Sequence, residues 1–147
     1  MIHFGIASGI SGPYFPCMKS HCPTNYALEH FGDRWTLLIV RDMFFKQYRY
    51  FADFLSCEEG ISTSVLTERL RAMEKSGLIV AEKDSDGRRQ RYVLTQKGWD
   101  LGRIMLEINR WSGKHDKNTE APAAHLQRIE SDFETLLNSY RDQSNAN

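Results

Sequence analysis

Hydroxyl and basic side chains share one side of the segment GISTSVLTERLRAMEKSGLI, residues 60–79. At about 100° per residue, the apolar Leu66, Leu70 and Met73 fall together on one face of a helix. The opposite face carries short hydroxyls and longer bases, and Ser62 precedes the helix as a candidate N-cap. Serine and threonine form helices less readily than glutamate and lysine, so a face turned only to water gains nothing from them. Hydroxyls and a guanidinium bind base edges and phosphates, so we expect Ser62, Thr63, Ser64, Thr67, Arg71 and Lys75 to contact nucleic acid.

A second basic cluster lies in DSDGRRQR, residues 84–91, between two segments rich in β-branched and apolar residues. An Asp-Gly turn between such segments predicts a β-hairpin. Arg88, Arg89 and Arg91 would then reach phosphates or the minor groove. The alternative is an ordinary charged hairpin, and Arg91, which begins the return strand, is the one best suited to a structural role. Arg49 could bind a phosphate or equally pair with Asp53, four residues on.

The three cysteines, Cys17, Cys22 and Cys57, are too few for a disulfide scaffold in a chain of 147 residues. With His21 they match no common zinc pattern, and adjacent ligands are geometrically awkward. No Ser/His/Asp or Cys/His arrangement and no phosphate-binding glycine loop is present. We therefore predict no metal, no cofactor and no enzyme; a thiol-based catalyst using Cys22 is the alternative.

Cys22 stands directly before Pro23 and a predicted helix, whose N-terminus can lower the pKa of the thiol. Cys22 is thus the candidate redox-sensing thiol. For its partner we favour Cys57, with the bond formed between subunits, because Cys57 ends the helix that supports residues 63–76; Cys17 is the other choice. The alternative that all three thiols are inert stays open.

The length of the chain and the distribution of its charges indicate what kind of domain carries these groups. A chain of 147 residues can bury roughly 70% of its unfolded surface in one core. The net charge is zero, but residues 60–98 hold eight bases against five acids, so one face can still bind anions. No apolar run approaches the ~18 residues of a membrane span, and no signal peptide is recognisable, so we expect a cytoplasmic protein. We divide the chain into an N-terminal arm (1–21), a DNA-binding domain with a dimerisation helix (22–115) and a helical extension (116–147).

Hydrophobic periodicity and caps predict the elements. Asp33 caps a core helix, a short helix follows in which Tyr50, Phe51, Phe54 and Leu55 point inward, and Thr95 begins a long helix. The predicted helices are residues 24–31, 34–45, 48–57, 63–76, 96–115 and 123–141, with the hairpin at 78–95. The fold class is mainly α with a small β-hairpin: a winged helix-turn-helix with extra N- and C-terminal helices that form a dimer interface.

The helix predicted at 96–115 carries more large apolar residues than so small a domain can cover. A dimer interface on this helix is therefore expected, to which the helix at 123–141 adds area; burial in the core of one subunit is the alternative. The interface residues would be Leu101, Ile104, Met105, Ile108 and Trp111.

Five segments together resemble the HxlR family of bacterial winged helix-turn-helix regulators, in the family's order and spacing. They are CP at 22–23, GDRWTLLIVRDM at 32–43, RYFADF at 49–54, residues 60–79, and RYVLTQKG at 91–98. The resemblance implies a dimer that binds operator DNA, often in response to electrophiles, oxidants or other small molecules, and many relatives carry a redox-active cysteine at the place of Cys22. The chain departs from the family in its first ~20 residues, after Pro122, and at Cys57 and Glu58, where small or apolar residues are expected.

The predicted function is a homodimeric, sequence-specific transcriptional regulator of repressor type that binds double-stranded DNA and responds to oxidants or electrophiles through Cys22. A winged-helix module for protein contacts is one alternative. A regulator that responds to a small ligand without thiol sensing is the other.

Overall fold

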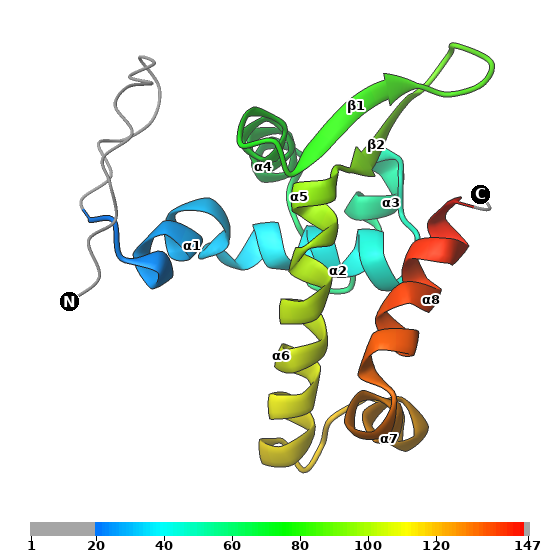
Figure 1. Ribbon diagram of the computed structural model, residues 1–147. Helices are drawn as coiled ribbons and strands as arrows, with labels where there is room; N and C mark the ends of the chain where they lie inside the picture. The colour runs from blue at the N-terminus through cyan, green and yellow to red at the C-terminus, as the bar shows by residue number, and fades with distance from the viewer. Residues whose placement is uncertain (1–19, 146–147) are drawn as a thin grey trace.

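The computed structural model describes residues 20–145, so Cys17 and nearly all of the predicted N-terminal arm lie outside the described residues. The fold is mainly helical with one two-stranded antiparallel hairpin, which confirms the predicted mainly α class with a small β-hairpin; the dimer interface stays a prediction (Figure 1). Its elements in chain order are α1 (Pro23–Phe31), α2 (Arg34–Phe45), α3 (Phe51–Leu55), α4 (Thr63–Lys75), β1 (Ile79–Lys83), β2 (Gln90–Leu94), α5 (Gln96–Trp99), α6 (Leu101–His115), α7 (Ala123–Ser131) and α8 (Phe133–Asn145).

The central helix α2 begins at the predicted cap, since the Asp33 carboxylate accepts from the backbone N–H groups of Trp35 and Thr36 at 3.0 Å each. It is buried over most of its girth, and Val40 and Met43 are fully buried. In Figure 1, α4 and the hairpin lie above α2, α6 extends below it to α7, and α8 rises from α7 past the end of α2 towards α3. The main core joins α2 to α4, to the hairpin and to the first turns of α6.

The third helix is shorter than predicted and spans only Phe51–Leu55. Phe54 is buried, but Leu55 is 37% exposed, so the prediction that Leu55 points inward is wrong. A helix of little more than one turn presents few side chains to the core, and Phe54 takes that position. The turn that follows passes through Gly60, whose φ of 71° favours glycine.

The hairpin pairs Ile79 with Leu94 through Lys83 with Gln90, as the Asp-Gly turn predicts. A third segment, not predicted, lies beside β2. Tyr50 forms an isolated antiparallel bridge with Arg91, and the Tyr92 N–H donates to the Arg49 carbonyl at 2.7 Å. The hairpin is thereby joined to the chain just before α3.

Two predicted helices are each broken into two. The helix expected at 96–115 bends at Asp100, where α5 ends and α6 begins. A Cβ added at Gly98 would lie 2.1 Å from the Leu78 carbonyl oxygen, so α5 packs directly on the backbone that leads into β1. The helix expected at 123–141 breaks at Asp132, whose φ is −152° and ψ is 48°. No helix among the described residues is long and apolar enough to cross a membrane.

The break at Asp132 lets α7 and α8 fold back on α6. Ile129 of α7 and Leu136 of α8 bury Leu106 of α6 in a second core cluster, which Phe45 of α2 also contacts. These residues alternate with polar ones in both halves, so the periodicity alone is compatible with a single helix. The packing of Ile129 and Leu136 on Leu106 therefore determines that the chain turns at Asp132.

Candidate nucleic-acid interface

The helix α4 is fixed by its apolar face. Leu66, Leu70 and Met73 are each at most 2% exposed and lie in the main core. Ser62 caps the helix by accepting from the Val65 N–H at 3.3 Å. Arg69, at the margin, forms an ion pair with Asp33 at 3.5 Å. These contacts hold α4 in one rotation about its axis.

The opposite face of α4 carries the predicted polar groups outward. Thr63, Ser64 and Arg71 are exposed, and Lys75 is exposed in the last turn. Thr67 is half-buried, and its hydroxyl donates to the Thr63 carbonyl at 2.8 Å. The structure thus brings the predicted residues of this helix onto one surface, with Arg71 two turns behind Thr63 and Ser64.

The hairpin arginines differ in their partners. Arg89 places its guanidinium 4.2 Å from the centroid of the Tyr50 ring, and its Nε donates to Asp84 Oδ2 at 3.2 Å. Arg91 donates through Nε to Glu82 Oε1 at 2.9 Å across the two strands. The Arg88 side chain is exposed and makes no hydrogen bond or ion pair with the other residues that the structure describes. Arg88 and Arg89 lie at the tip, and Arg91 lies closer to the base.

Arg49 is engaged inside the subunit, which favours a structural role over the predicted phosphate contact. Its guanidinium makes four hydrogen bonds: to the carbonyls of Met43 and Tyr48, to the Gln47 side chain and to the Ser144 hydroxyl. Burial, followed by the charge of Arg91, lowers the pKa of Arg49. Its alternative partner, Asp53, accepts from the Arg49 backbone N–H at 3.1 Å.

An ion-pair network that the sequence pattern does not indicate stands where the chain enters α4. Arg41 of α2 donates from Nη2 to Glu59 Oε2 at 3.0 Å, and the two groups form a second contact through Nη1. Arg41 and Lys46 also flank the buried Asp42, at 2.8 and 3.2 Å. The hydrogen bond from Arg41 lowers the pKa of Glu59 to about 2. Glu59 lies in a loop, where periodicity carries no information about partners.

The two described thiols occupy different environments. Cys22 is exposed at the N-cap of α1, ahead of Pro23. Hydrogen bonding with the backbone of Asn25 and then Thr24 lowers the pKa of the Cys22 thiol. Cys57 is half-buried against the main core, and neither thiol forms a disulfide within the described subunit. Between residues 20 and 145, no three His, Cys, Asp or Glu side chains are grouped as metal ligands.

The predicted interface residues of α6 divide between its two faces. Leu101 and Met105 are 5% and 4% exposed and belong to the core of the subunit itself. Ile104, Ile108 and Trp111 are 37%, 40% and 66% exposed and lie together on the outer face. With Arg103 and Glu107 they line one shallow apolar groove. An interface on α6 would therefore use the three outer residues.

A short supporting helix, a turn, a helix with an exposed polar face and a basic hairpin form a winged helix-turn-helix. The chain belongs to the HxlR-like helix-turn-helix family, whose model matches residues 30–120. This confirms the resemblance stated above.

Three similar proteins fit this assignment. The uncharacterised HTH-type transcriptional regulator Rv3095 of Mycobacterium tuberculosis is 36% identical over 101 residues, which are 68% of this chain and 63% of that protein. This chain thus spans less than two thirds of the length of that relative. The crystal structure of PA1607, described as a candidate transcription factor, superposes with a TM-score of 0.64 at 31% identity over 71% of this chain and 72% of that one. The structure of the redox regulator HypR in its oxidised form superposes with a TM-score of 0.58 at 25% identity, over 65% of this chain and 99% of that one.

Proposed function

We propose that this protein is a sequence-specific transcriptional regulator of repressor type that binds double-stranded DNA as a homodimer. The observation that carries the proposal is the outer face of α4, where Thr63, Ser64 and Arg71 stand exposed on a helix anchored by three buried residues. In such folds the second helix of the motif enters the major groove by its N-terminal end. Thr67 and Lys75 flank this surface, and Arg88 and Arg89 reach the adjacent backbone. The proposal includes no catalytic step and no cofactor.

Selection of binding sites from random duplex DNA tests this function. We expect one enriched sequence with two half-sites about one helical turn apart or a small multiple of it, because paired helices must enter one side of the duplex. The Thr67→Ala variant should bind the same sequence with relaxed preference at individual base pairs. If the protein enriches no sequence and binds no duplex even at low salt, the proposal fails and a winged-helix module for protein contacts takes its place.

The homodimer is proposed on the outer face of α6. Ile104, Ile108 and Trp111 form an apolar row that the subunit itself leaves uncovered. Trp111→Ala should shift the monomer–dimer equilibrium by several kcal/mol, as loss of a buried aromatic usually does, measured by analytical ultracentrifugation. Leu28→Ala, at another exposed apolar residue on α1, is the matched control and should leave the equilibrium unchanged. A parent protein that is monomeric at micromolar concentration would exclude this interface.

Response to oxidants or electrophiles through Cys22 is the finer part of the proposal. It is supported by the exposed position of Cys22 at a helix N-terminus, by its lowered pKa, and by similarity to a protein named as a redox regulator. A lowered pKa increases the thiolate fraction, and the thiolate is the reactive form. Cys57 is the proposed partner in a disulfide between subunits, close to the turn that leads into α4.

Treatment with diamide, a thiol oxidant, tests Cys22 as the sensor and Cys57 as its disulfide partner. We expect the parent to form a dimer on a non-reducing gel and to change its DNA affinity. Cys22→Ser should lose both responses; if it responds as the parent does, Cys22 is not the sensor. Cys57→Ser should lose the linked dimer and, because diamide acts by joining two thiols, the change in DNA affinity as well; a linked dimer in that variant would assign the partner elsewhere. A parent indifferent to oxidant leaves a regulator without thiol sensing.

A further inference from the structure

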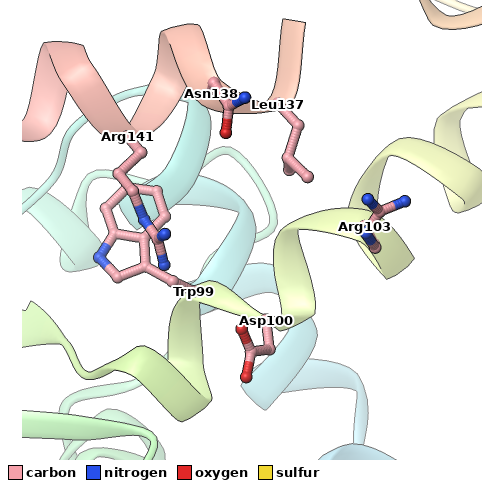
Figure 2. Close-up of a pocket in the computed structure, with 6 residues that line it drawn as sticks. All are labelled: Trp99, Asp100, Arg103, Leu137, Asn138 and Arg141. Atoms are coloured by element: carbon pink, nitrogen blue, oxygen red, sulfur yellow. The ribbon is translucent and has the colours of Figure 1, made fainter. Parts of the chain in front are cut away.

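A cavity of about 340 Å³ lies where the α5–α6 junction faces α8 (Figure 2). Its volume is near the lower end of the range found for small-molecule sites, roughly 300–1,000 Å³. None of the groups considered above for DNA, thiol chemistry or dimer contacts lies in its wall apart from Arg103. The lining residues are Trp99, Asp100, Arg103, Leu137, Asn138 and Arg141. The last three lie beyond residues 30–120, the part of the chain that matches the family model, so the family assignment does not describe this wall of the cavity.

Arg141 gives the cavity an available positive charge. Its guanidinium lies 5.7 Å from the centroid of the Trp99 ring, in front of that ring in Figure 2. It donates from Nη2 to Gln96 Oε1 at 2.8 Å, a neutral partner, and forms no ion pair with any residue in 20–145. Arg103, across the cavity, is already paired with Glu134. An anion entering the cavity would therefore meet Arg141 as the cation without a carboxylate partner.

The rest of the wall supplies an acceptor and an apolar surface. Asp100 accepts from Gln96 Nε2 at 2.7 Å through Oδ1, while its Oδ2 has no donor among the described residues. Trp99 and Leu137 provide flat and aliphatic surface, and Asn138 reaches the same space from α8 (Figure 2). The complementary molecule has a planar apolar body, a carboxylate for Arg141 and a hydrogen-bond donor for Asp100. Guanidinium groups bind carboxylates in a planar, often bidentate geometry.

We propose that this cavity binds a small aromatic carboxylate bearing a hydroxyl or amino group, and that binding changes the affinity of the protein for DNA. The effect on DNA affinity rests on the function proposed above. Binding of the carboxylate concerns the free protein and does not depend on that function.

The path from the cavity to DNA runs through α5. Thr95 at its cap donates to the Gly77 carbonyl at 2.5 Å, and Lys97 donates to the Ser76 carbonyl at 2.8 Å. Both carbonyls belong to the residues that end α4. Gly98 packs against the Leu78 carbonyl. A ligand that shifts Trp99 therefore acts on the one-turn helix that holds the end of α4 and the start of the hairpin.

Isothermal titration calorimetry of the full chain with para- and meta-hydroxybenzoate, para-aminobenzoate and benzoate tests the site. At least one hydroxylated or aminated acid should bind, more tightly than benzoate, and para-hydroxybenzamide, the neutral counterpart, should bind at least several-fold more weakly. Arg141→Met should weaken binding about tenfold or more, the usual size for loss of a hydrogen bond to a charged group. Arg128→Met, an exposed arginine on α7, should bind as the parent does.

A second variant guards against misfolding of the first. Asn138→Phe fills the cavity from an exposed helical position and leaves Arg141 in place, so it should also abolish binding with an unchanged melting temperature. The site is overturned if no probe binds the parent at millimolar concentration. It is equally overturned if both variants bind like the parent.

The regulatory half is tested on the selected DNA site with saturating acid. We expect at least a threefold change in apparent affinity for the parent, a size within the usual range of coupling between sites, and no change for Arg141→Met. Equal changes in both proteins, or none in the parent, would overturn the coupling. Failure of the protein to bind any DNA overturns the proposed function and with it the regulatory half, while calorimetry still decides whether the cavity is a binding site.

Discussion

In the proposed complex with DNA, α4 and the hairpin both present positive charge to the duplex, but they are built in opposite ways. On α4 the geometry is held by buried Leu66, Leu70 and Met73, which leaves Arg71 on the outer face without an ion pair among the described residues. On the hairpin, two of the three arginines predicted to contact DNA also hold the structure, Arg89 with Asp84 and Arg91 with Glu82, and Arg88 alone of the three has no ion pair among the described residues. Arg89 and Arg91 must therefore exchange a carboxylate for a phosphate, whereas Arg71 gives up no such partner.

This difference assigns distinct contributions to the two regions. Contacts from a rigid helix to base edges distinguish sequences, and contacts to phosphates raise affinity for all sequences alike. The paired carboxylates also reduce the positive field at the hairpin. We therefore expect α4 to determine most of the sequence specificity and the hairpin to add a modest, salt-dependent contribution to the affinity for all sequences.

The largest expected effect comes from removing the apolar anchor of α4. Leu70 is 2% exposed, so Leu70→Ala should lower the free energy of unfolding by about 2–5 kcal/mol, through lost burial and the cavity left behind. Urea unfolding followed by circular dichroism measures it. Val80→Ala, on a hairpin residue that is 45% exposed, should change stability by less than about 0.5 kcal/mol. If Leu70→Ala and Val80→Ala lower the free energy of unfolding equally, α4 is not anchored more firmly than the hairpin.

The next effect concerns specificity. Arg71→Ala should cost about 1–3 kcal/mol at particular base pairs of the selected site and relax preference there. Arg71→Lys keeps the charge but loses the planar fork, so it should recover affinity for non-specific DNA and not the lost preference. Competition binding with single-base variants of the site provides the measurement. A uniform loss over all sequences would place Arg71 on a phosphate.

A third effect concerns the ion pair at the entrance to α4. Because Arg41 holds the pKa of Glu59 at about 2, below its ordinary value of 4.5, this carboxylate stabilises the fold fully above pH 4.5. That contribution is lost as the pH falls from 4.5 through 2. Glu59→Gln should flatten the stability–pH curve in this window and cost on the order of 1 kcal/mol at neutral pH, as expected for a partly exposed pair. Glu58→Gln, one exposed residue earlier, should leave the curve as in the parent.

The smallest effect is expected at the tip of the hairpin. Arg89→Ala should weaken binding to all sequences alike and reduce the slope of log affinity against log salt by about one unit. The loss should be smaller than that of Arg71→Ala at the selected site, because Arg89 must first leave Asp84. Titrations of specific and random duplexes at several salt concentrations measure both quantities. A larger or sequence-dependent loss would show that the hairpin reads bases.

Residue spacing predicted the parts of this fold that follow local rules. The stripe of Leu66, Leu70 and Met73, the caps at Asp33, Ser62 and Thr95, and the Asp-Gly hairpin all depend on neighbours in the chain, and all are confirmed. Features decided by distant partners could not be found in this way. The close packing of Gly98 on Leu78 near the break at Asp100, and the burial of Leu106 beneath the corner at Asp132, both involve partners distant in the chain.

The same limit applies to the candidate site. The sequence shows which residues are basic, but not which of them already have a partner. Arg49 differs from Arg88 only in what surrounds it: four acceptors within the subunit for one, solvent for the other. Arg141 had no place in the sequence prediction, because its environment is made by Trp99 and Gln96, more than forty residues earlier in the chain.

The second core cluster bears on how short the protein can be made. Leu106, Ile129 and Leu136 are each at most 2% exposed, and Phe45 and Tyr140 pack against them. A fragment ending near residue 115, where the predicted DNA-binding domain stops, would carry Leu106 and Phe45 into solvent. The residues after His115 are thus no removable tail, and the smallest fragment expected to fold on its own extends through α8.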